Sequence, residues 1–434
     1  MARGRHRIGL LLAWLVFIAM WGTGAYADTR DVIVGKVAVT EPLSIAPPAM
    51  GGQVGKDIHG TLLADLRNSH SFTIVPYDGP NVTRPSAASS LIVPRGATYL
   101  VVLDVQVNGR DVVVSAFLLE AGRGRARWAR QYRLVTAALR QGTHQIADDI
   151  HKEVTGRPGF AATRIAYVAQ FEGHPAIFTV GPDGQGHRRL VSGKFACLFP
   201  KYAPGRNWLV YTAYKRRFPE LYLIDEISGR NHALSSRPGL NSFGAISPDG
   251  LTIAATLSFC GNPEIFLLSM TGKVKKRLTQ DRSCDLSPSW SPDGKQLVYV
   301  NDSSGKPQLY LMAADGEGKA KRITWPFNSS SYCVEPDWSP QGESIVFCAK
   351  VDGNFDIMQV DLKSGDVTAL TEGGPQESSP SWAPDGRHVV FATKSRGRTG
   401  LTILDTKNPN NRFSIPLPAS RTKVRSPSWQ RVVH

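Results

Sequence analysis

Short apolar runs alternate with turn residues at a regular period through the second half of the chain. Each repeat carries a phrase like "PSWSPDGKQLVYV", which runs from Pro288 to Val300, with a Trp two residues before a Pro-Asp-Gly turn and an alternating apolar segment after it. A period of roughly 40–50 residues built from four short strands predicts the blades of a β-propeller. The equivalent positions, which recur at this period, are Tyr202, Ile246, Trp290, Trp338, Trp382 and Trp429.

The repeated phrase has a structural explanation. Pro presets φ at the first central position of the turn, Asp tolerates the second, and Gly takes the left-handed conformation that follows. The Trp offers a large apolar surface for packing between blades, which must bury both of their faces. We therefore expect Trp290, Trp338 and Trp382 to pack between blades. The turn residues Asp249, Asp293 and Asp385 are expected to form turns and not to bind metal.

The number of blades follows from counting strands. The segment that begins at Arg164 supplies a second, third and fourth strand, and five complete repeats follow it. The terminal "PSW" at residues 427–429 is a first strand with nothing after it. Residues 159–434 are therefore predicted to form an all-β, six-bladed propeller in which the C-terminal strand completes the first blade. Closure of the ring removes exposed strand edges.

A different pattern precedes the repeats. Ile58, Leu62 and Leu66 lie four residues apart, as on one face of a helix, and so do Ile146, Ile150 and Val154. Two β-rich runs between these helices are joined by Asn-Gly, a strong hairpin signal. Residues 28–158 are therefore predicted to form a small N-terminal α/β (α+β) domain, so that the chain is a multidomain protein.

The N-terminal segment, from Met1 to Ala27, has the features of a signal peptide. Three arginines precede the apolar run "IGLLLAWLVFIAMW", and "AYA" at 25–27 is a small-x-small cleavage site. We expect cleavage after Ala27 and export to the periplasm; the alternative is an uncleaved anchor. No later apolar run approaches the length that spans a bilayer, so no membrane span is expected in the mature chain.

Composition narrows the choice of partners and chemistry. The formal charge is +15, but no Lys/Arg-rich block with interleaved aromatics indicates a nucleic-acid platform, and an exported protein is not expected to meet nucleic acid. The sequence contains no G-x-S-x-G, H-E-x-x-H, Walker A or dinucleotide-binding motif. We therefore expect no catalytic residue, no cofactor and no metal.

Five cysteines lie in the second part of the chain. The loop arrangement of a propeller places Cys260 and Cys284 on one face, which leads to the hypothesis of a disulfide between them. Cys333 and Cys348 lie on adjacent strands of one hairpin. They would face each other only if that hairpin contains no bulge, because a bulge shifts the register by one residue.

The chain resembles the TolB family, the periplasmic propeller component of the Tol-Pal system. The phrases that carry the resemblance are "PLSIAPPA", "DIHGTLLADLRNS", "YLVVLDV", "ARQYRLVTAALRQGTHQIADDIHKEVTG", "GFAATRIAYVAQ" and the P-x-W-S-P-D-G blades. The resemblance implies a monomeric scaffold, not an enzyme. It also implies two partners, the peptidoglycan-associated lipoprotein Pal at the mouth of the propeller and TolA at the mature N-terminus, and a role in outer-membrane integrity and cell division.

The resemblance also implies site residues. The family often has Thr-Glu where this chain has Leu286-Ser287, so one carboxylate of the family's pattern is missing here, while Glu335 holds the equivalent place one blade further on. The Pal-binding face implied in this way contains Asn241, Leu286, Ser287, Glu335 and Ser379. The N-terminal arm expected to bind TolA contains Asp28, Arg30, Asp31, Val32 and Val34.

Two other readings of the sequence stay open at this point. An exported propeller enzyme or carbohydrate-binding protein would need a polar or acidic cluster in the propeller channel. The propeller half of a two-part peptidase is disfavoured, because the sequence ends at His434 with no hydrolase domain after the blades.

Overall fold

The computed structural model describes residues 40–46, 52–77, 93–123, 126–325 and 332–431. The expected signal peptide and the N-terminal arm lie outside these described residues. Contacts within the chain divide it into two units, with the division between Ala162 and Thr163. The domain boundary predicted from the sequence lies between residues 158 and 159.

The N-terminal unit is a five-stranded sheet with two helices. Its order is β2-β1-β3-β4-β5, in which β1 pairs in parallel with both of its neighbours and the remaining pairs are antiparallel. The expected Asn-Gly hairpin is the β3–β4 turn. The elements are β1 (Glu41–Ile45), α2 (Gly52–Asn68), β2 (Phe72–Ile74), β3 (Tyr99–Asn108), β4 (Asp111–Glu120), β5 (Ala126–Val135), a short 3-10 helix (Thr136–Ala138) and α3 (Leu139–Thr155).

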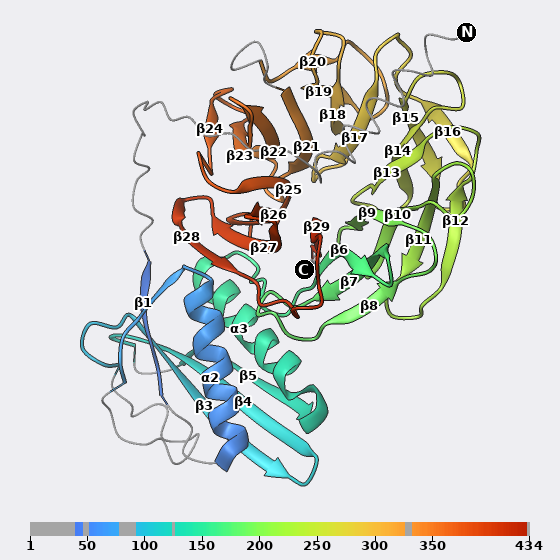
Figure 1. Ribbon diagram of the computed structural model, residues 1–434. Coiled ribbons are helices and arrows are strands. Elements are labelled where there is room, and N and C mark those ends of the chain that lie inside the picture. The colour runs from blue at the N-terminus through green and yellow to red at the C-terminus, as the bar shows by residue number, and fades with distance from the viewer. Residues whose placement is uncertain (1–39, 47–51, 78–92, 124–125, 326–331, 432–434) are drawn as a thin grey trace. The chain divides into compact units, whose positions relative to one another are not determined.

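Both helices contribute to one core with the sheet, and Figure 1 shows them side by side. Ile58, Leu62 and Leu66 of α2 are buried, as their spacing predicts. Gly156 ends α3 with φ of 72°, a left-handed conformation that glycine adopts without strain.

The second unit consists of six four-stranded antiparallel sheets, which confirms the six-bladed propeller. We number the blades from the one that contains the C-terminal strand. Blade 1 contains β29 (Arg425–Trp429), β6 (Ile165–Phe171), β7 (His174–Val180) and β8 (Arg188–Val191); blade 2 contains β9 (Cys197–Tyr202), β10 (Trp208–Ala213), β11 (Glu220–Asp225) and β12 (Asn231–Ser235); blade 3 contains β13 (Asn241–Ile246), β14 (Thr252–Leu257), β15 (Glu264–Ser269) and β16 (Val274–Arg277). Blade 4 contains β17 (Asp285–Trp290), β18 (Gln296–Asn301), β19 (Gln308–Ala313) and β20 (Lys321–Arg322); blade 5 contains β21 (Tyr332–Trp338), β22 (Ser344–Val351), β23 (Asn354–Asp361) and β24 (Val367–Ala369); blade 6 contains β25 (Gln376–Trp382), β26 (His388–Ser395), β27 (Arg398–Asp405) and β28 (Asn408–Ser414).

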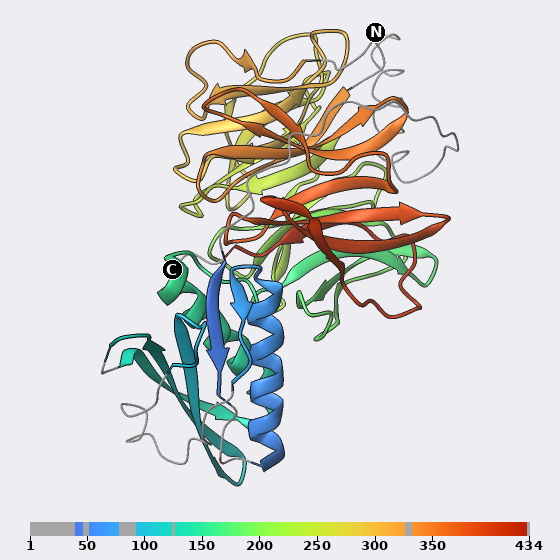
Figure 2. The same ribbon diagram turned by 90° about the vertical axis from the view of Figure 1, so that its left-hand side faces the viewer.

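The ring closes through the C-terminal strand. β29 pairs antiparallel with β6, with Trp429 opposite Ile165. Figure 1 shows the red β29 beside the green β6, and Figure 2 shows the same strands of the propeller turned by 90°. The first blade is therefore assembled from the two ends of the repeat region.

The tryptophans and aspartates of the repeated phrase act as expected. Trp382 is buried in a cluster with Val346 and Ile357 of the preceding blade. Asp293 Oδ1 accepts a hydrogen bond of 3.0 Å from the amide of Lys295, which closes the turn. The same bond is made by Asp249 to Leu251 N and by Asp385 to Arg387 N.

Removing residues 425–434 tests the closure. This truncation leaves blade 1 without its inner strand and without the buried Trp429, a loss that costs about 3–5 kcal/mol for the Trp side chain alone. We expect the melting temperature of the propeller to fall by roughly 10 °C or more, measured by tryptophan fluorescence.

A control truncation that removes only residues 432–434 retains β29 and should melt close to the full-length protein. An unchanged melting temperature in the longer truncation would contradict the closure of the ring by β29.

Candidate binding site at the mouth of the propeller channel

The inner strand of each blade changes register near its middle. In blade 4, for example, the pairing of β17 with β18 shifts between Leu286 and Ser289. A residue other than glycine with positive φ lies at every one of these shifts. Positive φ is uncommon for such residues and marks a conformation that the surrounding structure enforces. The six residues and their φ angles are Phe199 (52°), Phe243 (51°), Ser287 (54°), Glu335 (54°), Ser379 (55°) and Ser426 (47°).

These six residues, which we call the mouth ring, surround the propeller axis. With the residues that follow them they line a cavity of about 90 Å³ to which every blade contributes. The ring has an apolar side and a polar side. Phe199 and Phe243 of blades 2 and 3 pack with their ring centroids 4.4 Å apart, while three serines and Glu335 occupy the other four blades.

Glu335 links two blades within the mouth ring. Its Oε2 accepts a hydrogen bond of 2.8 Å from the amide of Ser379, and its Oε1 accepts one of 3.1 Å from the hydroxyl of Ser379. Burial raises the pKa of Glu335, although the two bonds from Ser379 oppose this effect. The carboxylate therefore holds the polar side of the ring together.

A second ring of side chains lies two residues further along the inner strands. In four blades this residue is Ser or Asp, and its side chain accepts the backbone amide of the next blade's inner strand. We call this arrangement the belt. Its bonds run from Trp338 N to Ser289 Oγ (3.3 Å), from Trp382 N to Asp337 Oδ2 (2.8 Å), from Trp429 N to Ser381 Oγ (3.0 Å) and from Tyr202 N to Ser428 Oγ (3.0 Å).

Asp337 of the belt also forms two ion pairs. Lys201 Nζ lies 2.6 Å from Oδ1, and Arg431 Nη2 lies 2.5 Å from Oδ2. Burial would raise the pKa of Asp337, but Arg431 and Lys201 outweigh burial, so its pKa is lowered. Blades 2 and 5 are opposite each other in a ring of six, so the Lys201–Asp337 pair crosses the channel beneath the mouth ring.

The structure separates the expected Pal-binding residues into two groups. Ser287, Glu335 and Ser379 come together in the mouth ring and line its cavity. Asn241 and Leu286 are buried, with exposed fractions of 0% and 3%. Asn241 Nδ2 donates to the carbonyls of Pro219 and Arg237, and Leu286 belongs to an apolar core. These two side chains support the face without being presented on it.

The cysteines differ from the disulfide hypothesis. All five lie in the described part of the chain, and within it no disulfide joins Cys260 to Cys284. Cys348 pairs with Val334, and Cys333 with Ala349, because the inner strand shifts register at Glu335. The bulge alternative for this hairpin is therefore the one observed.

Sequence reasoning missed the belt and the two phenylalanines of the mouth ring. The signal for the belt was present, because the residue before Trp is Ser or Asp in "PSW" and "PDW". The repeated phrase predicts a role for the Trp and for the turn, but it predicts none for this Ser or Asp. Nothing in the local sequence indicated that Lys201 and Arg431 would reach Asp337.

Asp337→Asn tests the charge at the centre of the belt. Removing one partner of a buried ion pair costs about 3–5 kcal/mol, because the other charges stay buried. We expect the variant to lose about that much unfolding free energy at pH 7, measured by urea denaturation with tryptophan fluorescence.

The pH dependence of this effect has a definite sign. Since the pKa of Asp337 is lowered in the folded state, its stabilisation is complete above the unfolded pKa of about 4 and is lost as the pH falls through the folded pKa. The difference between wild type and variant should therefore shrink at pH 3. The control Ser428→Ala removes the belt hydroxyl that accepts Tyr202 N, and it should cost about 1 kcal/mol without this pH dependence. A difference that stays constant with pH would show that Asp337 is not ionised in the folded protein.

Comparisons with known proteins agree with this architecture. A family model described as "TolB beta propeller domain" matches residues 151–433. The Tol-Pal system protein TolB of Gluconobacter oxydans is 29% identical over 275 residues, which cover 62% of this chain and 60% of that protein. The namesake from Desulfosudis oleivorans is 30% identical over 283 residues, which cover 62% of this chain and 64% of that protein.

A solved structure extends the match beyond the propeller. The crystal structure of TolB from Acinetobacter baumannii superposes with a TM-score of 0.76 at 27% identity and covers 91% of this chain and 97% of that one. The sequence alignments span somewhat less than two thirds of the length of the two curated relatives. The family model alone matches well over half of the chain. The chain belongs to the TolB family.

Proposed function

We propose that this chain is a periplasmic scaffold of the Tol-Pal system that binds Pal at the mouth of the propeller channel and TolA through its mature N-terminus. In this role it supports outer-membrane integrity and cell division. The observation that carries the proposal is the mouth ring, in which six enforced backbone conformations present side chains at one point on the propeller axis.

The chemistry of the mouth ring favours binding over catalysis. Its one carboxylate, on Glu335, is engaged by the backbone and the hydroxyl of Ser379. General acid–base catalysis uses groups positioned to exchange a proton with a substrate. The aromatic side of the ring, at Phe199 and Phe243, suits the apolar anchor of a protein partner.

The segment from Met1 to Ala27 supports the periplasmic location, since it has the features of a signal peptide. No helix in the described ranges is long and apolar enough to cross a bilayer. In this proposal, Pal and TolA both bind at the surface of the protein.

Binding of purified mature protein to Pal from the same organism tests the proposed face. Ser287→Arg places a long cation in the mouth of the channel, and we expect it to weaken binding at least about tenfold, equivalent to about 1.4 kcal/mol. Glu335→Arg should weaken binding as well. Calorimetry gives the affinities, and melting curves show whether each variant is folded.

Leu251→Arg is the matched control. Leu251 is 63% exposed and lies in the turn between β13 and β14, at the opposite end of the inner strands from the loops that precede the mouth ring. This variant should bind Pal as the wild type does. Equal affinities for all four proteins would show that the mouth is not the Pal-binding face.

A variant that lacks residues 28–34 separates the two partners. It should lose binding to TolA while it keeps binding to Pal, because the mouth ring is intact. If the variant still binds TolA, the arm is not the TolA-binding segment. The residues of the arm are Asp28, Arg30, Asp31, Val32 and Val34.

A further inference from the structure

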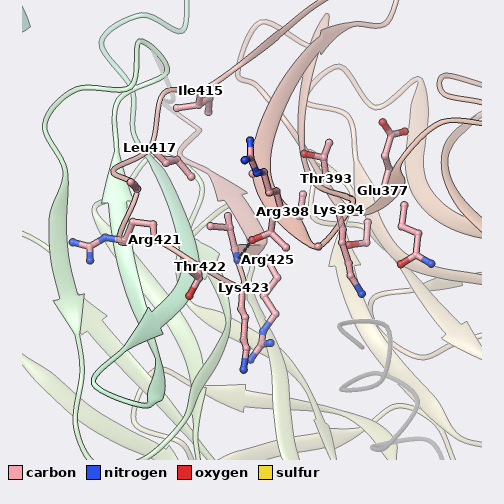
Figure 3. Close-up of a pocket in the computed structure, with 18 of the residues that line it drawn as sticks. Glu377, Thr393, Lys394, Arg398, Ile415, Leu417, Arg421, Thr422, Lys423 and Arg425 are labelled. Atoms are coloured by element: carbon pink, nitrogen blue, oxygen red, sulfur yellow. Dashed lines mark hydrogen bonds between the residues drawn. The ribbon is translucent and has the colours of Figure 1, made fainter. Parts of the chain in front are cut away.

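A larger pocket lies in the propeller between blade 6 and the connection that leads to β29. Its volume is about 970 Å³. One wall comes from the strands of blade 6 around Lys394 and Arg398, and the other comes from residues 415–425 (Figure 3). Small-molecule sites usually have volumes of about 300–1,000 Å³, so this pocket is large enough for a ligand of that size.

The lining is strongly cationic. Lys394 and Arg398 contribute two positive charges from blade 6, and Arg421, Lys423 and Arg425 contribute three from the other wall. In Figure 3 the side chains of Lys423 and Arg425 extend in the same direction.

These cations are not neutralised within the protein. Among the described residues, no carboxylate forms an ion pair with Lys394, Arg398, Lys423 or Arg425. Burial lowers the pKa of Arg425, and no acidic group counteracts this effect. Arg421 is engaged elsewhere, because its guanidinium lies 4.0 Å from the ring centroid of Phe178 and forms a hydrogen bond with Tyr167, and in Figure 3 it extends away from Lys394 and Arg398. Lys394 and Arg425 are half-buried, so each loses part of its hydration without gaining a carboxylate partner, and an anionic ligand would offset that cost.

Glu377 is the one acidic side chain among the described residues that line the pocket, and burial disfavours the ionised form of its carboxyl group. It is buried, its Oε2 has no hydrogen-bond partner, and its Oε1 lies 3.8 Å from Nη1 of Arg412. Burial raises the pKa of Glu377. Burial, together with electrostatic repulsion from the nearby Glu377 carboxylate, raises the pKa of Asp356 to about 7.

Apolar residues complete the pocket. Ile415, Leu417 and Val424 lie on the same wall as three of the cations. Apolar surroundings reduce the local dielectric constant, so each cation interacts with an anion more strongly than it would in open water.

We propose that this pocket binds a compact organic polyanion with two or more phosphate or carboxylate groups. Two of the four cations other than Arg421, namely Arg398 and Arg425, are arginines, whose planar guanidinium groups match both anion types with paired hydrogen bonds. The lining residues of this pocket and of the mouth ring do not overlap, although the two sets adjoin at Ser378–Ser379 and at Arg425–Ser426.

Calorimetric titration of the full mature protein with pyrophosphate and, separately, with tricarballylate tests the proposal and distinguishes the two anion types. At low salt we expect at least one of them to bind with a Kd below about 1 mM, and more weakly as salt is added. The double variant Lys394→Gln/Arg398→Gln should weaken that binding at least tenfold.

The matched control is Lys319→Gln/Lys363→Gln, which removes two exposed charges from loops between third and fourth strands and should bind like the wild type. As a second pocket variant, Arg425→Met should also weaken binding while its melting temperature stays the same or rises, because Arg425 is half-buried and no carboxylate among the described residues pairs with it. Ser287→Arg should leave anion binding unchanged, which keeps this test independent of the Pal experiment.

Three outcomes would overturn the proposal: neither anion binds, both double variants lose affinity equally, or only an acidic peptide such as oligoglutamate binds. The last result would assign the pocket to a protein segment instead of a compact anion.

Discussion

The propeller depends on how the inner edge of each blade satisfies its backbone amides. An innermost strand has a neighbouring strand on one side only, and an unpaired buried amide costs free energy comparable to a lost hydrogen bond. In four blades the same arrangement satisfies one of these amides. A Ser or Asp side chain of the preceding blade accepts a hydrogen bond from a backbone amide of the innermost strand. The belt therefore joins neighbouring blades in addition to their apolar packing and to other polar contacts such as that between Glu335 and Ser379. Its one charged member, Asp337, holds Lys201 and Arg431 in the channel as well.

Much of the fold was predictable from local sequence. The period of the Trp and Pro-Asp-Gly phrases predicts the blades, and the unpaired "PSW" near the C-terminus predicts that β29 completes blade 1. The first depends on interactions within one repeat, and the second follows from counting the strands of the repeats, although the pairing itself joins the two ends of the repeat region. The contacts of Asp337 were not predictable in this way, because they join blades 1, 2 and 5 across the channel. Burial of Asn241 and Leu286 escaped prediction for a related reason: a loop position that matches a family pattern does not reveal which way its side chain points.

The mouth ring and the cationic pocket place different chemistry on one propeller. The ring combines two phenylalanines with hydroxyl groups and one engaged carboxylate, which suits a protein surface. The pocket gathers unneutralised positive charge against apolar walls. One is built by the same position in every blade, whereas the other exists only where the long connection to β29 departs from the repeat.

The pairing of β29 with β6 has a consequence for how the protein is made. Trp429 donates its indole N–H to Thr163, 266 residues earlier in the chain. Contacts between such distant residues form late, because a long loop must be closed first. As the chain emerges N-terminal end first, blades 2 to 6 can each complete their own sheets, but blade 1 waits for the last strand. The ring therefore closes only once the last strand has been synthesised, and a chain interrupted before Arg425 leaves the edge of β6 without its partner strand.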